Sequence, residues 1–368
     1  MFKIPKLVSS TKRSLWWMLG AALTLNTAAI AQDTSSWQSV TEEMELGASI
    51  DYNGVQLFPI RSASSDGVKL DVLTLREGLN LGVVSVVEQG EGNVAQLTVV
   101  NSGQKPVLLA VGDVVEGGRQ DRVIVSDLLV PPNKQPTPVA VHCVERGRWT
   151  QGAQRVAFNY GGRGESGLKK VLQMESNQQA TWGAVASLNQ TKGSQIQRLA
   201  ARNEPSHAQE MLSDAPLHSQ VFAELQPPTE TYMASLSSAA VETHLTDYTE
   251  AMAPLLEEAG LIGVVVAVDG ELVAAEAYGD PRLFRSSARD IIRSVGLDAL
   301  SVGAGSDPSH QVSPTQAAEF LGTALSETAL SRVNSTTGIH TQKRSESASS
   351  YELHDSNGGL LHLNVYAH

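Results

Sequence analysis

Two short blocks of charged and reactive residues are the part of this chain best suited to chemistry: Gly112–Arg122 and His142–Trp149. Together they hold four glycines, four arginines, four acids, a glutamine and the sole cysteine of the sequence, Cys143. Between them, Val123–Val125 and Leu128–Val130 have the composition of plain β strands. Polar, glycine-containing turns on a regular scaffold predict a functional site, although no standard catalytic signature fits these residues.

The glycines and arginines of these blocks predict an anion-binding turn. Gly112 and Gly117 have the spacing of a phosphate loop. Gly118 and Arg119, however, stand where that loop needs lysine and serine or threonine, so a nucleoside triphosphatase loop is excluded. Glycine turns present backbone N–H groups to anions, and the planar fork of arginine suits phosphate and carboxylate. The expected ligand-binding residues are Gly117, Gly118, Arg119, Gln120, Arg122, Glu145 and Arg148. The alternative is that the arginines pair with acids inside the fold.

Cys143 and Glu145 are the candidates for a catalytic role. A thiolate nucleophile needs a lowered pKa, which the arginines of the blocks could supply. Residues 139–144 have a strand pattern, however, so His142 would point away from Cys143 and could not act as its base. Glu145 would share the face of Cys143 and raise the pKa of the thiol. A buried structural thiol is therefore the favoured interpretation of Cys143, and Glu145 remains a candidate general base.

Neither a metal site nor a cofactor is expected. His142 and Glu145 would lie on opposite faces of one strand, while His354 and His362 flank a predicted turn near the C-terminus. The sequence contains no H-x-x-H, H-E-x-x-H or C-x-x-C spacing for a metal. It also lacks the G-x-S-x-G motif of serine hydrolases.

The N-terminus has the composition of an export signal. Lysines and one arginine precede the apolar run Leu15–Ile30, and Ala29–Ala31 forms an A-x-A cleavage site before Gln32. The run is shorter than the roughly 20 residues of a membrane-spanning helix. We expect residues 1–31 to be a cleaved signal peptide and the mature protein to be soluble, periplasmic or secreted, and free of the membrane.

The charge of the chain argues against nucleic acid as a partner. Residues 1–31 carry four cations and no acids, which leaves 23 lysines and arginines against 39 aspartates and glutamates, a formal charge of −16. Nucleic acids and anionic membranes are bound chiefly through basic patches. A small anionic ligand bound by local arginines is compatible with this surface, whereas a polyanionic partner is not.

Hydrophobic patterning predicts one α+β domain over residues 46–368, after a loose polar segment at 32–45. Residues 55–102 are rich in strand patterns, which include Lys69–Leu75. Residues 160–235 are a polar insert of helices and long loops, with one helix predicted over Gly167–Asn189.

The last third of the chain is predicted to alternate helices with a hairpin. Its expected elements are a helix over 235–259 that Pro254 kinks, a hairpin turning at Asp269-Gly270, a helix from Pro281, a capped helix from Ser313 to about Val333, and a final strand Leu360–Val365. The serine-rich run Ser345–Ser350 is expected to be a loop. Glu276, like Glu242 and Glu257-Glu258, is expected on a solvated face.

The two blocks are expected to meet in space. Residues 123–141 are long enough for a strand out, a turn at Pro131–Pro136 and a strand back. Antiparallel pairing would then place Cys143–Arg148 beside Gly117–Arg122. We expect direct side-chain contact between the blocks, with at least one arginine partly exposed in a concavity.

The blocks also carry a family resemblance. The run Gly112–Arg122 followed by Cys143–Trp149 resembles the paired hallmark of the ADP-ribosylglycohydrolase and rhodanese-phosphatase superfamily-associated proteins. Further segments that carry the resemblance are Ala95–Gly103, Pro106–Leu109, Ile262–Gly270, Phe284 and Asp298–Leu300. The resemblance covers roughly residues 45–368 and implies a link to ADP-ribose or phosphate chemistry without assigning a reaction.

Three functional hypotheses follow from these patterns. The first is an exported domain that binds an anionic, phosphate-bearing or ribose-bearing ligand at the two blocks. The second is a hydrolase or transferase that uses Glu145 as base or Cys143 as nucleophile at the same place. The third is a structural envelope protein. An enzyme requires a base within hydrogen-bond reach of a reacting atom in a concave pocket, which separates the second hypothesis from the others.

Overall fold

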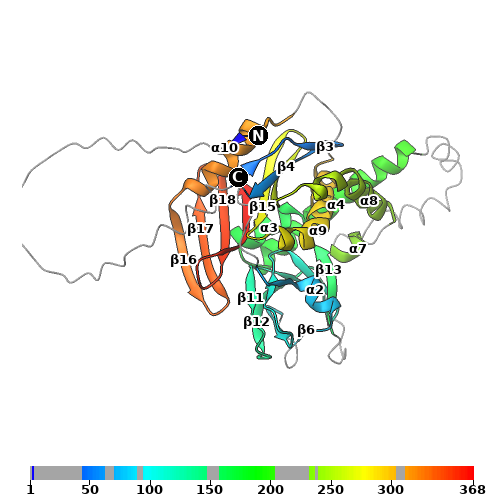
Figure 1. Cartoon of the computed structure of the whole chain (residues 1–368). Helices are drawn as coiled ribbons and strands as arrows, with labels where there is room; N and C mark the ends of the chain where they lie inside the picture. Colours follow the sequence, from blue (N-terminus) through cyan, green and yellow to red (C-terminus); the bar gives the residue numbers. More distant parts are fainter. Residues whose placement is uncertain are drawn as a thin grey trace, which may run out of the picture.

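The computed structural model describes residues 2–3, 44–62, 70–88, 94–146, 157–203, 232–236, 239–303 and 311–368. The predicted cleavage site, nearly all of the predicted signal peptide and most of the polar segment 32–45 lie outside these ranges, as do Arg148 and Trp149. Within them the chain has an α+β fold, in which helices pack on antiparallel sheets (Figure 1). No helix of this part is long and apolar enough to cross a membrane.

The larger sheet contains strands from both the start and the end of the described chain. Its strand order is β1-β2-β4-β14-β15-β19-β18-β17-β16, with β3 paired to β4, and every pairing is antiparallel. The strands are β1 (Phe2–Lys3), β2 (Met44–Leu46), β3 (Ile50–Tyr52), β4 (Val55–Ser62), β14 (Leu261–Val268), β15 (Glu271–Tyr278), β16 (Ala329–Ser335), β17 (Gly338–Arg344), β18 (Ala348–His354) and β19 (Leu360–Ala367). The central strand β14 is buried along its whole length, so both faces of the sheet must be covered.

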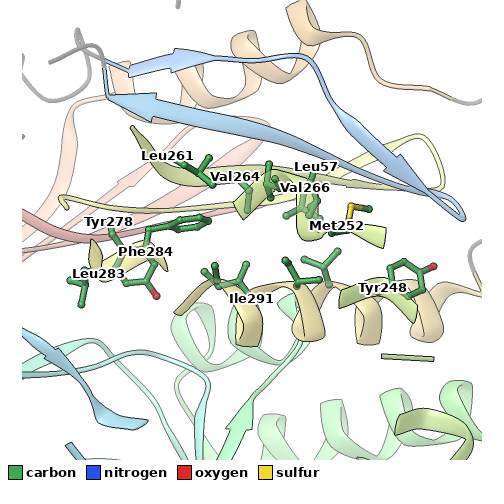
Figure 2. Packing of buried hydrophobic residues seen from close by; sticks show 14 of the residues in the cluster. Leu57, Tyr248, Met252, Leu261, Val264, Val266, Tyr278, Leu283, Phe284 and Ile291 are labelled. Atoms are coloured by element: carbon green, nitrogen blue, oxygen red, sulfur yellow. The ribbon is translucent and has the colours of Figure 1, made fainter. Parts of the chain in front are cut away.

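One face is covered by α9 (Pro281–Val302), together with α8 (Ala239–Ala251) and the 3₁₀ turn η1 (Ala253–Glu257). Figure 2 shows the contact: Phe284 and Ile291 of α9 face Val264 and Val266 of β14. Burial of side chains of this size contributes roughly 1.5–3 kcal/mol each. This layer therefore supplies a large part of the stability that holds α9 in place.

The other face is covered by α10 (Pro314–Ser326), whose Ala317, Leu321 and Ala324 pack on Phe58 and Val265 of the sheet. The capping box of Ser313 and Gln316 is present, as the sequence predicts.

The smaller sheet carries the two sequence blocks. Its order is β13-β9-β10-β12-β7-β6, and all neighbours are antiparallel. Its strands are β6 (Val84–Val87), β7 (Gln96–Asn101), β9 (Asp113–Glu116), β10 (Arg122–Ile124), β12 (Thr137–Cys143) and β13 (Asn159–Arg163). A three-stranded sheet of β5 (Leu73–Thr74), β8 (Val107–Leu109) and β11 (Leu128–Val130) packs against it with α2 (Leu75–Asn80).

Helices of the polar insert cover the opposite side of the smaller sheet. They are α3 (Ser166–Met174), α4 (Gln178–Asn203) and α7 (Tyr232–Leu236). Leu168, Leu172 and Val185 of α3 and α4 pack with Val114 and Val123 of the sheet. The described helices of the insert therefore share a hydrophobic cluster with the smaller sheet.

Two sequence predictions, one of a strand and one of a helix, are wrong because side-chain caps start helices that the sequence did not predict. Lys69–Leu75 was expected to be a strand, but of its described residues, 70–75, Leu73–Thr74 alone lie in a strand, because Thr74 and Glu77 form a capping box that starts α2. The helix predicted over residues 167–189 is two helices. Ser176 has a left-handed φ of 49°, and the Asn177 side chain caps the next helix by accepting from the Ala180 N–H at 2.8 Å.

Three further predictions near the C-terminus are wrong because strand pairing overrides local pattern. The helix expected to reach Val333 ends at Ser326, and residues 329–335 form β16 at the sheet edge. The predicted loop Ser345–Ser350 enters β18 at Ala348. Glu276 is not on a solvated face: it is 4% exposed. The hairpin at Asp269-Gly270 is confirmed, with both residues at positive φ.

Candidate functional site

The two sequence blocks lie side by side in the smaller sheet. β10 and β12 pair antiparallel, with Arg122 opposite Cys143. The turn before β10 places Gly117 at a φ of 135° and Gly118 at 59°, conformations that L side chains rarely adopt. A Cβ at Gly118 would also lie 2.5 Å from the ring of Phe158. Glycine is therefore required at Gly118, and the predicted contact between the blocks is confirmed.

Gln120 joins the two blocks directly. Its side-chain amide donates to the backbone oxygen of Glu145 at 3.0 Å, and its Oε1 accepts from the thiol of Cys143 at 3.1 Å. The backbone N–H of Asp121 donates to the Glu145 carboxylate at 3.0 Å. These bonds fix the turn against the end of β12 and orient the Glu145 carboxylate, while the Gly117 N–H donates to the Asp121 carboxylate at 2.9 Å.

The arginines of the first block pair with groups inside this junction. Arg122 is 0% exposed. Its guanidinium donates to the backbone oxygen of Gln120 at 2.7 Å and to the carboxylate of Glu88 at 3.5 Å. The side chain of Arg119 is 19% exposed and lies 3.9 Å from Glu88. The geometry therefore matches the alternative in which these arginines pair with acids inside the fold.

Cys143 has the environment of a packed thiol. It is fully buried. Burial raises the pKa of the Cys143 thiol; Arg122 opposes this shift, while Glu88 and Glu145 add to it. His142 points to the other side, where its Nδ1 lies 2.7 Å from the Thr181 hydroxyl. This environment lowers nucleophilicity at neutral pH, because the thiolate is the reactive form.

A cleft of about 380 Å³ opens beside the blocks. Its volume is within the usual range for small-molecule sites. Five acidic side chains line it, together with two arginines. The charged lining residues are Glu116, Asp121, Glu145, Glu242, Asp290, Arg163 and Arg293. The apolar side chains in the lining are Met233, Leu236, Leu245 and Leu297, from α7, α8 and α9.

The strand β13 forms one wall of the cleft through an irregular, glycine-rich segment. Its pairing with β9 shifts register between Tyr160 and Gly162. Gly162 has a φ of 114°, and nothing lies within 4 Å of the position where its Cβ would be. Backbone rather than side chain therefore borders the cleft there, which leaves room for a ligand to approach closely.

Of the seven expected ligand-binding residues, Glu145 lines this cleft, and its neighbour Asp121 lines it too. Gly117, Gly118, Arg119, Gln120 and Arg122 form the junction behind these two carboxylates. Arg148 lies outside the described residues. The blocks thus bring three acids, Glu116, Asp121 and Glu145, to the cleft, whereas Arg119 and Arg122 do not line it.

A buried ionic cluster lies directly beneath the cleft. Arg163 donates to Asp113 at 3.1 Å, to the Tyr278 hydroxyl at 2.6 Å and to the carboxylate of Glu276. The ammonium of Lys169 bonds the other Glu276 oxygen at 2.8 Å. Burial alone would raise the pKa of Glu276, but Lys169, Arg163 and His362 together hold it well below its usual value.

At the cleft end, the cluster runs through Tyr160. Its hydroxyl lies 3.1 Å from Asp113 and 3.2 Å from Asp290 of the cleft wall. Burial raises the pKa of Asp113, although Arg163 lowers it in part. Burial also raises the pKa of Tyr160 well above its usual value, and both aspartates add to the shift.

The other end of the cluster reaches Asp127 through His362. The ring of His362 lies 3.2 Å from Glu276 and 2.8 Å from Asp127. Burial alone would lower the pKa of His362, but Asp127 and Glu276 raise it to about 9. Burial alone would raise the pKa of Asp127, but the charge and hydrogen bond of His362 lower it overall. An imidazolium between two carboxylates is therefore the expected state at neutral pH.

The sequence matches the ARG and Rhodanese-Phosphatase-superfamily-associated Protein domain, ARPP-1, over residues 43–366. The chain belongs to this family. No curated protein and no solved structure matches it.

Sequence reasoning missed the ionic cluster of this ARPP-1 domain, although one signal was present. Along α9, Ser287, Asp290, Ser294 and Asp298 recur at helical spacing and are all buried. Ser294 donates to the backbone oxygen of Gly164 at 2.7 Å. Such a stripe is normally read as the solvated face of an amphipathic helix. One face of α9 is buried against the large sheet. The polar stripe on the opposite face packs against β13 and α3 instead of facing solvent.

Proposed function

We propose that this protein is an exported ligand-binding domain whose cleft takes a small polyhydroxylated molecule, such as a ribose-bearing compound. One observation carries the proposal: the two family blocks meet and bring Asp121 and Glu145 to the lining of a cleft of about 380 Å³. Carboxylates accept hydrogen bonds from neighbouring hydroxyl groups. The leucines on the helical side can pack against the apolar face of a sugar ring.

The charges of the lining favour hydroxyl donors over an anion in the interior of the cleft. Four of the five N–H donors of Arg163 bond Asp113, Glu276 and Tyr278, and its side chain is only 4% exposed. Arg293 is the arginine placed to meet an anion, because its side chain is 26% exposed and its partner Glu242 is 54% exposed. Exposed ion pairs of this kind are worth about 1 kcal/mol or less. A phosphate on the ligand would therefore bind at the rim, beside Arg293.

The export signal supports placing this binding activity outside the cytoplasm. Cleavage after Ala31 would remove only β1 from the described elements. The pairing of β2 with β4 does not involve that strand, so the large sheet does not depend on it.

Calorimetric titration with ribose and ribose 5-phosphate tests the proposal. We expect both to bind, and the Glu116→Gln variant to bind both roughly tenfold more weakly, the loss of one hydrogen bond of about 1.4 kcal/mol. Glu116 is exposed at the cleft, so this change should not affect folding. Glu271→Gln, at an exposed position on β15 that does not line the cleft, is the matched control.

The two ligands separate the hydroxyl and phosphate contributions. Arg293→Gln should weaken ribose 5-phosphate and leave ribose unchanged. Absence of saturable heat for both ligands, or equal affinity in the Glu116 and Glu271 variants, would refute a polyol site in the cleft. Saturable binding of ribose 5-phosphate without any binding of ribose would instead favour an anion site, as the sequence predicts.

A hydrolase acting in the same cleft is the second candidate, because Glu145 lies there beside Asp121. A general base must lie in a concave pocket within reach of the reacting atom. A chromogenic riboside tests this directly: release of the chromophore by the wild type and not by Glu145→Gln would support it. Cys143 is not part of this candidate, because it does not line the cleft.

A further inference from the structure

A second cavity, of about 160 Å³, lies on the far side of the ionic cluster from the cleft. It is lined by the end of α3, the connection between β10 and β11, and strands β16 to β18 of the large sheet. The cleft and this cavity share no lining residue. The volume is far above the 10–15 Å³ that holds one water molecule, so a small organic molecule fits.

Asp127 gives this cavity a charged acceptor. Its carboxylate accepts from the Val111 N–H at 2.7 Å, from His362 at 2.8 Å and from the Asn364 amide at 3.2 Å. An ionised carboxylate offers about four acceptor positions. Three are therefore used by these partners, and one is left for a donor in the cavity that Asp127 lines.

The other polar groups of the lining add acceptors, and the one further charged residue among them is Glu352. The Oε1 atom of Gln173 is buried and accepts no hydrogen bond from the described residues. Burial lowers the pKa of His340, so its ring is neutral at neutral pH. Tyr351 completes the polar side and accepts from the Gln342 amide at 3.3 Å. No lysine or arginine is among the residues that line the cavity in the described chain.

We propose that this cavity is a second binding site, specific for small molecules that carry a primary ammonium group. An ammonium has three donors and no acceptor, which matches the vacant position on Asp127 and the amide oxygen of Gln173. A charged donor to a carboxylate makes a hydrogen bond about twice as strong as a neutral one. An anion would face the Asp127 carboxylate without a compensating cation in the lining. The proposal does not depend on what binds in the cleft.

Histidine-selective NMR of the full protein at neutral pH tests this site, because His340 lies in its wall. The probes are ethanolamine, ethylene glycol and glycolate, which have similar size and carry a positive, no and a negative charge. We expect ethanolamine to shift the His340 resonance saturably, with a Kd on the order of 1–10 mM for so few atoms. Ethylene glycol should bind at least roughly tenfold more weakly, and glycolate should not compete.

Two tryptophan variants on the edge strand locate the binding. Ser331 is exposed at the cavity, so Ser331→Trp should block it and weaken ethanolamine at least tenfold. Val333 is 57% exposed on the same strand and does not line the cavity, so Val333→Trp is the matched control. A third variant, Gln173→Leu, removes the buried acceptor and should also weaken binding.

Selective, saturable binding of ethanolamine that Ser331→Trp abolishes and Val333→Trp preserves supports the proposal. No saturable shift at roughly ten times the expected Kd overturns it, as does ethylene glycol binding as tightly as ethanolamine. Equal effects of the two tryptophans would place the binding elsewhere on β16 and also overturn it.

Discussion

The ionic cluster predicts a specific pH dependence of stability, centred on His362. The imidazolium is 0% exposed and lies between the carboxylates of Asp127 and Glu276. Those two contacts raise its pKa from 6.5 to about 9, against the opposing effect of burial. In the unfolded chain the same ring titrates near 6.5. Between pH 6.5 and about 9, the folded protein therefore keeps a proton on His362 that the unfolded chain has released.

The sign and size of the effect follow from linkage. Where the folded state binds one more proton than the unfolded state, the free energy of unfolding falls by 1.36 kcal/mol per pH unit. The interval from 6.5 to about 9 thus corresponds to a contribution of about 3 kcal/mol from His362. The contribution is fully present below pH 6.5 and is lost as the pH rises through about 9. Glu276 does not reverse this trend, since its lowered pKa affects stability only under acidic conditions.

The perturbation is His362→Gln, which keeps two hydrogen-bonding atoms and cannot titrate. Urea unfolding of both proteins between pH 6 and about 10 gives the difference in their free energies of unfolding. We expect this difference to shrink by about 3 kcal/mol as the pH rises from 6.5 to 9. Titrating groups remote from His362 are common to both proteins and cancel in the difference.

Direct titration of the ring provides an independent check. In a histidine-selective NMR titration, the His362 signals, assigned by their loss in the variant, should remain those of the charged form until about pH 9. A midpoint at or below 6.5 would refute the reasoning. Parallel stability curves for the two proteins across the same interval would refute it as well.

Three further predictions concern burial and export. Lys192→Met should cost about 3–5 kcal/mol in urea unfolding, because Glu165 and Lys192 are both 0% exposed and 2.9 Å apart. Adding Glu165→Leu to that variant should restore much of the loss, which a purely steric effect of methionine would not allow. Cys143→Ala should cost about 1–2 kcal/mol and leave ribose titrations unchanged, and a thiol reagent should label native Cys143 more slowly than free cysteine. A chain beginning at Gln32 should elute as a single species on gel filtration without detergent, and its recovery only in membranes would contradict a cleaved signal.

Elements that depend on neighbouring residues could be predicted from the sequence. The hairpin at Asp269-Gly270 follows from two residues that accept positive φ. The start of α9 at Pro281 follows from proline at its first position, with the Asp280 side chain as cap. The return of β12 beside β10 was likewise predictable, because one connection of limited length joins them. Here local pattern and tertiary structure agree.

The composition of the candidate site could not be predicted in the same way. Arg163 and Glu276 are 113 residues apart in the chain, and Asp127 and His362 are 235 apart. Each residue taken alone has the pattern of an ordinary strand or loop position. Their partnership arises only when β15 and β19 of the large sheet are placed against β13 and the connection after β10. The reading of Glu276 as solvated failed for this reason.

The sequence blocks themselves illustrate a related limit. Their arginines suggested a site for anions, but residue type does not reveal which side of a turn is buried. Arg122 faces inward to Glu88, and the glycines serve the tight turn that lets it do so. The same turn leaves Asp121 and Glu145 at the cleft. The blocks thus lie beside the cleft, while Arg122 is buried behind its lining.

The ionic cluster lies between the cleft and the second cavity and contacts the lining of both. Replacing a buried ion pair by apolar residues of similar volume is often neutral or stabilising, so an unselected interior would not be expected to bury Arg163, Glu276 and His362 together. The hydrogen bonds of the cluster run without a break from Asp290, in the lining of the cleft, to Asp127, in the lining of the second cavity. Each cavity thereby receives a carboxylate whose charge and orientation are set from behind by fixed partners. Preorganised acceptors of this kind favour ligands with donor groups, because no side chain has to be reoriented when they bind. Both proposed sites therefore depend on preorganised carboxylates, which would bind hydroxyl groups in the large cleft and an ammonium in the small cavity.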